Sequence, residues 1–254
     1  MINLQQIEKL AKYYQIDGFT IYREYLQLLF LNYLYQHRKS AGIYFKGGTA
    51  IHLLLDSPRF SEDLDFSSLY GQTIITGIIK EVEKQINSEL PNTKVSLLYR
   101  GRKSVRFRLI NKTAGFKYPF TVRIDFSHEP NLKKIITSSL VTKFPLVFFP
   151  IITHLSNQEI LAEKIRALLT RAKGRDIFDL WFLLEKGINI DSHLVNKKLK
   201  EANVIFSKEK LFTKLISFSQ KKLASDLSKF LPKSQRRILA ILKKELLKKL
   251  KTVY

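Results

Sequence analysis

The stretch from Tyr44 to Ser67 constrains this chain more than any other part of its sequence. It reads YFKGGTAIHLLLDSPRFSEDLDFS, in which a double glycine precedes an apolar run and an Asp-Leu-Asp triplet. The apolar residues before Gly47-Gly48 favour a strand, and the glycines end it. Thr49 is a favourable helix cap, and the apolar run behind it predicts a short helix. The stretch is therefore expected to fold as strand, tight turn, helix and second strand.

The double glycine is suited to a phosphate. A glycine-rich turn that enters a helix leaves backbone N–H groups unpaired at the helix N-terminus, and glycine lets a phosphate approach them closely. A Gly-Gly pair by itself is more often only a turn.

Asp63 and Asp65 alternate with apolar residues, so on a strand their side chains point to the same side. Two neighbouring carboxylates repel each other unless a cation lies between them. Carboxylate oxygens suit Mg²⁺, which in turn binds substrate phosphates. An isolated Asp-x-Asp is usually a solvated strand face or a turn. The order strand, Gly-Gly, helix and Asp-x-Asp is what a combined phosphate and metal site requires.

Two segments, KGGTA at 46–50 and RFSEDLDF at 59–66, resemble the signature of the AbiEii/AbiGii toxin family. That family belongs to the polymerase-β-like nucleotidyltransferase superfamily. The resemblance implies an α+β fold, with a small mixed sheet and helices as the nucleotidyltransferase core and a helical C-terminal domain. It also implies a set of residues that bind the nucleotide and its phosphates: Lys46, Gly47, Gly48, Thr49, Arg59, Ser61 and Lys164.

The composition indicates a folded protein with a polyanionic partner. A chain of 254 residues that is 45% hydrophobic can bury one large core or two small ones. Its net charge of +22 attracts nucleic acid, nucleotides or an acidic protein. The absence of cysteine excludes disulfides and thiolate zinc sites. The N-terminus lacks a signal-peptide pattern and the most apolar run is too short to span a bilayer, so a cytoplasmic protein without membrane contact is expected.

Periodicity predicts helices over 3–15, 19–38 and 74–90, strands over 94–99, 104–110 and 120–126, and one apolar strand or extended run over 141–149. Arg106 and Arg108 share the polar face of one strand. That face is either solvated or a cationic wall for a triphosphate or an RNA backbone. We expect a nucleotidyltransferase core with N-terminal helices over 1–150 and a helical, strongly basic domain over 151–254.

Asp125 lies on a predicted strand between apolar residues, where a carboxylate needs a partner. Its partner is either an arginine such as Arg123 or a metal ion. The resemblance implies that Asp125 is the third carboxylate of the superfamily, so that Asp63, Asp65 and Asp125 are catalytic and hold Mg²⁺ or Mn²⁺. Two such ions would support in-line displacement on an NTP. Asp125 would also help to deprotonate the attacking hydroxyl.

Residues 156–186 predict two helices, and Trp181 is expected on the buried side of the second. Ser156 and Glu159 suggest a capping box, and Asp176 and Asp179 are expected in the first turn of the second helix, where acidic groups suit the helix dipole. The segment EKIRALLTRAKGRDIFDL again resembles the AbiEii pattern, which implies catalytic roles for Lys164 and Asp176. Lys164 would contact the phosphates, and Asp176 would orient Lys164 or Arg171 or contact the nucleotide. Asp179 is most simply an ordinary first-turn acid.

The C-terminal 61 residues carry 17 basic and four acidic side chains, and so hold +13 of the net charge. Apolar spacing predicts helices there, including a final one that spans Ile238 to Leu250. One lysine-rich helix face is normally just solvated, but a bias across several helices favours a polyanionic partner.

The resemblance implies a toxin of a toxin–antitoxin or abortive-infection system, with a cognate antitoxin. It implies nucleotide transfer from an NTP to an RNA acceptor, with tRNA as the acceptor in characterised relatives. Nothing in the sequence distinguishes the four NTPs. Two alternatives stay open: a same-fold enzyme that modifies a protein or a small molecule, and a non-catalytic RNA- or partner-binding module.

Overall fold

The computed structural model describes residues 2–113, 116–130, 132, 135–146 and 150–253. The chain forms two compact units. The first comprises Met1–Asp56 and Phe60–Leu155, and the second comprises Ser57–Arg59 and Ser156–Tyr254. Residue 150, after which the sequence predicted a boundary, directly precedes the last strand of the first unit.

The first unit is built on a mixed sheet of seven strands in the order β3-β4-β5-β2-β1-β7-β6. The pairs β2–β5 and β1–β7 are parallel and the others are antiparallel. The expected α+β class is therefore confirmed. The strands are β1 (Ile43–Lys46), β2 (Asp63–Ser68), β3 (Thr93–Arg100), β4 (Ser104–Asn111), β5 (Phe120–His128), β6 (Ile135–Ser139) and β7 (Ile151–Leu155).

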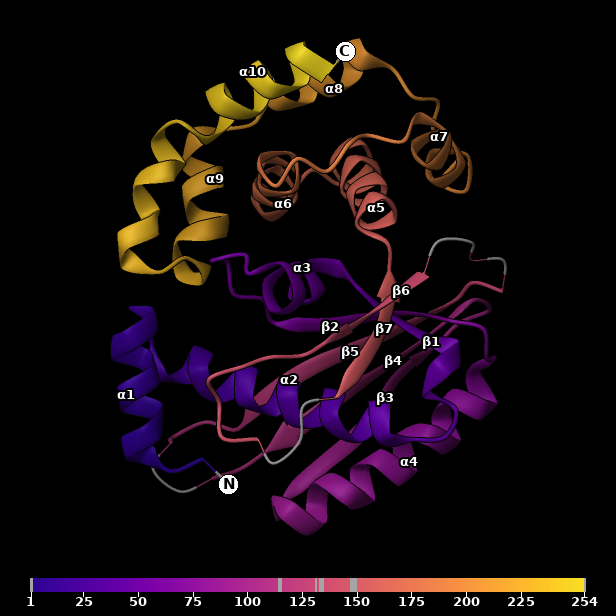
Figure 1. The fold of residues 1–254 in the computed structure, drawn as a ribbon, viewed down its shortest axis with the longest axis vertical. Helices are drawn as coiled ribbons and strands as arrows, with labels where there is room; N and C mark the ends of the chain where they lie inside the picture. Colours follow the sequence, from indigo (N-terminus) through magenta and orange to yellow (C-terminus); the bar gives the residue numbers. More distant parts are fainter. Residues whose placement is uncertain (1, 114–115, 131, 133–134, 147–149, 254) are drawn as a thin grey trace. The chain divides into compact units, whose positions relative to one another are not determined.

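Helices cover both faces of this sheet. Figure 1 shows α2 (Gly18–Gln36) and α4 (Gln72–Glu89) on one side and α3 (Gly47–Leu55) on the other. The sheet face towards α2 is apolar, because every second residue of the strands points to that face and is large and hydrophobic. The stacked rings of Phe66 and Phe126 lie at the centre of this face. The first helix, α1 (Leu4–Tyr14), contacts α2. A short 3₁₀ turn, Ser40–Gly42, leads into β1.

Two local predictions for this unit are wrong. Thr49 does not cap α3, which begins two residues earlier, with Lys46 as the cap residue. Of the two alternatives for 141–149, a strand or an extended run, the strand does not form in 141–146, and residues 147–149 lie outside the described residues. Instead, the short segments β6 and β7 flank this connection and pair with each other. They are brief and not strongly alternating, so periodicity alone did not find them.

The second unit is helical, as expected. Its α-helices are α5 (Asn157–Thr170), α6 (Gly174–Glu185), α7 (Ser192–Lys200), α8 (Lys208–Ser217), α9 (Gln220–Leu227) and α10 (Leu242–Val253), with 3₁₀ segments at Ser228–Phe230 and Lys233–Ala240. Four helices begin with a side-chain oxygen that accepts from the third backbone N–H, as helix caps do.

Three expectations for the second unit need correction. The final predicted helix is divided, because 3₁₀ geometry runs to Ala240 and the α-helix starts only at Leu242. Only half of the predicted capping box forms, since Ser156 Oγ accepts from Glu159 N while the Glu159 carboxylate has no hydrogen bond to the described residues. Trp181 is half-buried rather than part of the core.

Candidate active site

The turn between β1 and α3 requires glycine for two reasons. Gly47 has a φ of +82°, a conformation that L side chains rarely adopt. A Cβ placed there would also lie 2.9 Å from Asp65 Cβ and would collide with the Asp65 carboxylate. The Thr49 hydroxyl donates to the backbone oxygen of Asp63, which ties the start of α3 to β2. The helix N-terminus is therefore held beside the Asp-x-Asp strand.

The sheet register brings three predicted site residues into one row. Lys46 on β1 lies opposite Asp65 on β2, and Asp65 lies beside Asp125 on β5. Asp125 in turn lies opposite Arg106 on β4. Paired residues project to the same face of a sheet, so these four side chains share the face that α3 occupies. Asp63 lies two residues before Asp65 and so shares that face as well.

Arginines accompany the carboxylates of this row. Arg123 on β5 is ion-paired with Asp63, and its Nε lies 3.2 Å from Asp125 Oδ2. Arg106 also pairs with Asp125. Partial burial lowers the pKa of Arg123, but the charges of Asp63 and Asp125 outweigh this and raise it above its usual value.

The Lys46 ammonium lies at the other end of the row. It donates to Glu129 Oε1 at 2.7 Å, and the Ser67 hydroxyl donates to the same oxygen at 2.7 Å. Lys46 is only 7% exposed, so its ammonium is partly shielded from water. The hydrogen bond to Glu129 fixes the direction in which the ammonium points. Sequence reasoning did not single out Glu129, because it follows β5 in a segment that was expected to be only a connection.

The three aspartates offer the donor chemistry that Mg²⁺ or Mn²⁺ requires, on adjacent positions of one sheet face. Within the described ranges, however, no three carboxylate, histidine or cysteine side chains converge closely enough to hold a metal ion. Arg123 contacts two of the three carboxylates, those of Asp63 and Asp125. The residue types and their register fit a metal site, and a bound metal ion would compete with Arg123 for these carboxylates.

The second unit contains a buried cluster around Asp179. Arg59 donates to this carboxylate twice, from Nε at 2.7 Å and from Nη2 at 2.9 Å, and Lys164 Nζ lies 2.8 Å from Asp179 Oδ2. Burial raises the pKa of Asp179, but the charges of Arg59 and Lys164 lower it to about 2. Asp179 is thus not a first-turn acid, as the sequence suggested, but the shared anion of two predicted phosphate-binding cations.

Asp176 lies in the first turn of α6, as predicted. Its oxygens accept from Arg171 Nε at 3.1 Å and Nη2 at 2.9 Å, and one also accepts from Lys173 N at 3.3 Å. Of the two orienting roles considered for Asp176, the structure contains the contact with Arg171, whereas Lys164 is held by Asp179. The Asp176 side chain is almost fully buried, and that of Arg171 is 57% exposed.

The remaining predicted positions are placed as follows. Gly48 is buried in the first turn of α3. Ser61 precedes β2, and its backbone oxygen accepts from Gln27 Nε2 at 3.0 Å. The first unit therefore joins Lys46, Gly47, Thr49 and the aspartates, and the second unit joins Arg59 and Lys164.

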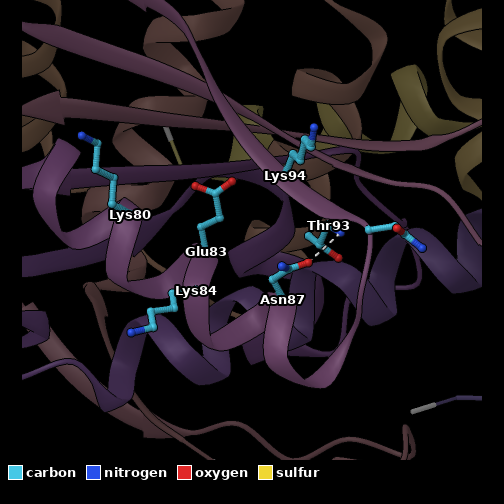
Figure 2. A pocket seen from close by; sticks show the side chains of 7 residues that line it. Lys80, Glu83, Lys84, Asn87, Thr93 and Lys94 are labelled. Carbon is cyan, nitrogen blue, oxygen red and sulfur yellow. Dashed lines mark hydrogen bonds between the residues drawn. The ribbon is translucent and has the colours of Figure 1, made fainter.

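A separate polar groove of about 470 Å³ lies along α4 and the start of β3. Figure 2 shows Lys80 and Lys84 on α4, with Asn87 bonded to Thr93 beside them. Glu83 accepts from the backbone N–H of Val95 and so ties the helix to the edge strand. These contacts show that the groove forms where α4 packs against β3. The helix α4 lies on the side of the sheet opposite α3 (Figure 1).

A family model for the AbiEii nucleotidyl transferase toxin of type IV toxin–antitoxin systems matches residues 29–248. The chain belongs to the AbiEii nucleotidyltransferase toxin family. The match covers most of both units. It includes the residues of the row, which are Lys46, Asp65, Asp125 and Arg106, and those of the Asp179 cluster, which are Arg59, Lys164 and Asp179. It makes the protein a nucleotidyltransferase toxin, and membership of a type IV system implies an antitoxin partner.

Three solved structures are similar to this chain in fold. MenT4, a nucleotidyltransferase toxin from Mycobacterium tuberculosis, has a TM-score of 0.64 and 17% identity, with 100% of this chain and 91% of that chain covered. A putative nucleotidyltransferase from Helicobacter pylori has a TM-score of 0.56 and 20% identity, covering 92% and 97%. JHP933 from the same organism has a TM-score of 0.54 and 21% identity, covering 93% and 95%.

A comparison with curated protein sequences finds no match. In the part of the chain that the structure describes, no helix is long and apolar enough to cross a membrane.

Proposed function

We propose that this toxin transfers a nucleotidyl group from an NTP to an RNA acceptor, with tRNA as the acceptor, in a reaction that depends on Mg²⁺ or Mn²⁺. One observation carries the proposal: the register that sets Asp65 beside Asp125, with Asp63 on the same face and the start of α3 at its side. This is the arrangement of carboxylates and phosphate-binding turn that nucleotidyl transfer requires.

Different residues around the row would bind the donor phosphates and the metal. The N-terminus of α3 and Lys46 would bind donor phosphates, because backbone N–H groups and a directed ammonium both favour anions. Asp63, Asp65 and Asp125 would hold the metal. When bound, the metal would stabilise the attacking and leaving oxygens of an in-line displacement. The acceptor hydroxyl oxygen bonds to the α-phosphorus, pyrophosphate leaves, and Asp125 accepts the hydroxyl proton.

In the second unit, Lys164 and Arg59 are proposed to bind the nucleotide, with Asp179 fixing both cations. Asp176 is proposed to orient Arg171, whose side chain is 57% exposed, so that its guanidinium can reach a phosphate. Asp179 and Asp176 then act as positioning residues.

Charge supports RNA as the acceptor. The C-terminal segment carries +13 of the net charge of +22, and its lysines are spread over several helices. Such a surface releases counterions from a polyanion and favours its binding. A small-molecule acceptor would gain little from a basic surface of this extent. The location of the transferase in the cytoplasm, where tRNA is found, is part of the same proposal.

The proposal is tested by incubating the protein with each of the four α-³²P NTPs, Mg²⁺ and total tRNA. The comparison includes Asp65→Ala and the control Glu8→Ala, which removes an exposed carboxylate from α1. We expect label on RNA with at least one NTP, lost in Asp65→Ala and kept in Glu8→Ala.

Other outcomes would contradict parts of the proposal. Label on protein or on a small molecule in place of RNA would identify a different acceptor. Transfer of label when EDTA is present throughout the reaction would exclude the metal requirement. RNA retention without any label in any arm would favour a binding module.

A further inference from the structure

Tyr99 extends the row of aspartates and arginines by one strand. It lies on the edge strand β3 directly opposite Arg106, which in turn lies opposite Asp125. The row therefore runs Tyr99, Arg106, Asp125, Asp65 and Lys46 across five adjacent strands. Neighbouring strands lie about 4.8 Å apart, so the Tyr99 backbone is about 10 Å from that of Asp125.

A β-bulge determines which face Tyr99 occupies. The pairing of β3 with β4 shifts by one residue between Leu97 and Tyr99. Without that shift Tyr99 would lie opposite Val105, whose side chain is buried in the core. The extra residue turns the tyrosine to the aspartate face instead, and bulges commonly redirect side chains in this way.

The Tyr99 ring is exposed and lies close to Gly101. It is 53% exposed, which is unusual for a side chain of this size beside a polar row. A Cβ at Gly101 would lie 2.6 Å from Tyr99 Cζ, so the ring lies over Gly101 and depends on the missing side chain. An exposed aromatic ring is suited to stack on a planar group.

The position of Tyr99 in the row indicates which substrate it meets. The phosphate-binding turn and Lys46 lie at the β1 end, and they are proposed to hold the donor. Tyr99, Arg106 and Arg108 lie at the β3–β4 end, beyond Asp125. An acceptor whose hydroxyl is activated at Asp125 would extend towards this end, with arginines near its phosphates and the ring near a base.

We propose that Tyr99 stacks on a base of a single-stranded segment of the RNA acceptor and so places the acceptor hydroxyl at Asp125. This proposal rests on the proposed transferase function. Stacking is tolerant of base identity, so Tyr99 would provide affinity and position rather than sequence recognition.

The first test compares Tyr99→Ala, Tyr99→Phe and Tyr118→Ala. Tyr118 is a matched control because it is also exposed, at 65%, but lies in the connection between β4 and β5 at the other end of those strands. A second control, Lys84→Ala, removes a cation from α4, which lies on the opposite side of the sheet from α3 (Figure 1).

The readout without NTP is the affinity for fluorescein-labelled oligoadenylate, measured by anisotropy. We expect about tenfold weaker binding for Tyr99→Ala, because one stacked base is lost. Tyr99→Phe should bind as the unmodified protein does, and both controls should stay within about twofold. Equal binding by Tyr99→Ala and the unmodified protein would overturn the proposal.

The readout with NTP is the KM for total tRNA and for the NTP in the transfer reaction. A rise of about tenfold in the tRNA KM for Tyr99→Ala, with an unchanged NTP KM, supports acceptor stacking. A rise confined to the NTP KM would assign Tyr99 to the donor base and overturn it. If the unmodified protein labels no RNA, the transferase proposal fails, and the anisotropy series decides the stacking proposal alone.

Discussion

Arg123 is the residue whose contacts bear most directly on how the active site is used. It pairs with Asp63 and Asp125, two of the three proposed metal ligands. A guanidinium and a metal ion would compete for the same carboxylates. Arg123 would then act as an internal counter-ion that keeps the carboxylates from repelling each other while no metal is bound.

This competition predicts tighter metal binding when Arg123 is neutralised. The Arg123 side chain is 45% exposed, so each ion pair contributes only about 0.2–1 kcal/mol. Mn²⁺ should therefore bind Arg123→Gln up to about fivefold more tightly than the unmodified protein, as measured by electron paramagnetic resonance of free Mn²⁺. Arg108→Gln is the control, since Arg108 is exposed on the same face but opposite Arg123 rather than an aspartate. Equal Mn²⁺ affinity in all three proteins would exclude the competition.

Asp179 predicts a pH-dependent contribution to the stability of the second unit. Its pKa is lowered from 3.8 to about 2, so its stabilisation is fully present above about pH 4 and is lost as the pH falls towards 2. The shift corresponds to about 2 kcal/mol. Because Asp179→Asn would remove the buried anion that Arg59 and Lys164 share, it should cost about 3–5 kcal/mol at neutral pH.

The measurement is urea unfolding followed by the fluorescence of Trp181, the single tryptophan, which lies in the same helix as Asp179. Asp179→Asn should lower the free energy of unfolding at pH 7 and flatten its decline between about pH 4 and 2. Glu201→Gln, an exposed carboxylate in the same unit, should change neither. A full acid-induced decline in Asp179→Asn would assign that decline to other groups.

Gly47→Ala should damage both the turn and the site. The positive φ costs an alanine about 1 kcal/mol, and the new methyl group must push Asp65 aside. We expect a lower Tm and loss of transfer activity. Gly77→Ala, where an added Cβ meets nothing within 4 Å in the interior of α4, should raise the Tm slightly or leave it unchanged. A Gly47→Ala protein with full activity would contradict the need for close approach.

At the residue scale, the sequence predicted the strands that carry the aspartates but not most of the partners of their side chains. Strand alternation was enough to set Asp63 and Asp65 on one face, and Asp125 stood out as a carboxylate among apolar neighbours. An arginine partner for Asp125 was one of two readings, and the structure contains it. Asp179 was misjudged because its partner Arg59 is 120 residues away, and no local pattern reports so distant an ion pair.

At the scale of elements, α2 shows how a buried helix is started. The Asp17 carboxylate accepts from Thr20 N and from Thr20 Oγ1, each at 2.8 Å. Asp17→Ala removes both bonds and should cost about 1 kcal/mol of stability, seen as a lower Tm in circular dichroism. Asp17→Asn can still accept from the backbone N–H and should recover most of the loss. Equal losses for both variants would mean that charge, not capping, matters at this position.

Long elements with a clear period were predictable, and short ones were not. The helix predicted over 74–90 is observed as Gln72–Glu89, and the strand predicted over 120–126 as Phe120–His128. The strands β6 and β7 have five residues each, and their formation depends on pairing with each other. Likewise, the start of α3 is fixed by the conformation of Gly47, which outweighs the local preference for Thr49 as a cap.

At the scale of the whole molecule, the extreme charge predicts how RNA binding depends on salt. Lys244, Lys248 and Lys251 are exposed on α10. If the basic tail contacts the RNA backbone, changing all three to glutamine should reduce the slope of log K against log salt by about 2, because each phosphate contact on a single strand contributes about 0.7. The comparison is a variant in which two exposed lysines of another helix, Lys80 and Lys84 on α4, are changed to glutamine. An unchanged slope in the α10 variant would assign the polyanion site to another surface.

Family and fold were accessible from the sequence because the Gly-Gly and Asp-x-Asp motifs are local. The family match over residues 29–248 and the mixed sheet confirm that inference. The order of the strands was not accessible in this way, because β5 joins β2 across more than 50 residues of intervening chain. That pairing is what assembles the three aspartates.

The most direct test of the central claim is single-turnover transfer of ³²P from the preferred NTP to tRNA by the unmodified protein, Asp65→Asn, Asp125→Asn and Glu8→Ala. We predict that Asp65→Asn and Asp125→Asn each lose at least about 10²-fold in rate while retaining the unmodified protein's Tm, because charge stabilisation in the transition state is removed without disturbing the core. Glu8→Ala should react at the unmodified rate. Rates for Asp65→Asn and Asp125→Asn within about threefold of that rate would contradict a catalytic role for the row.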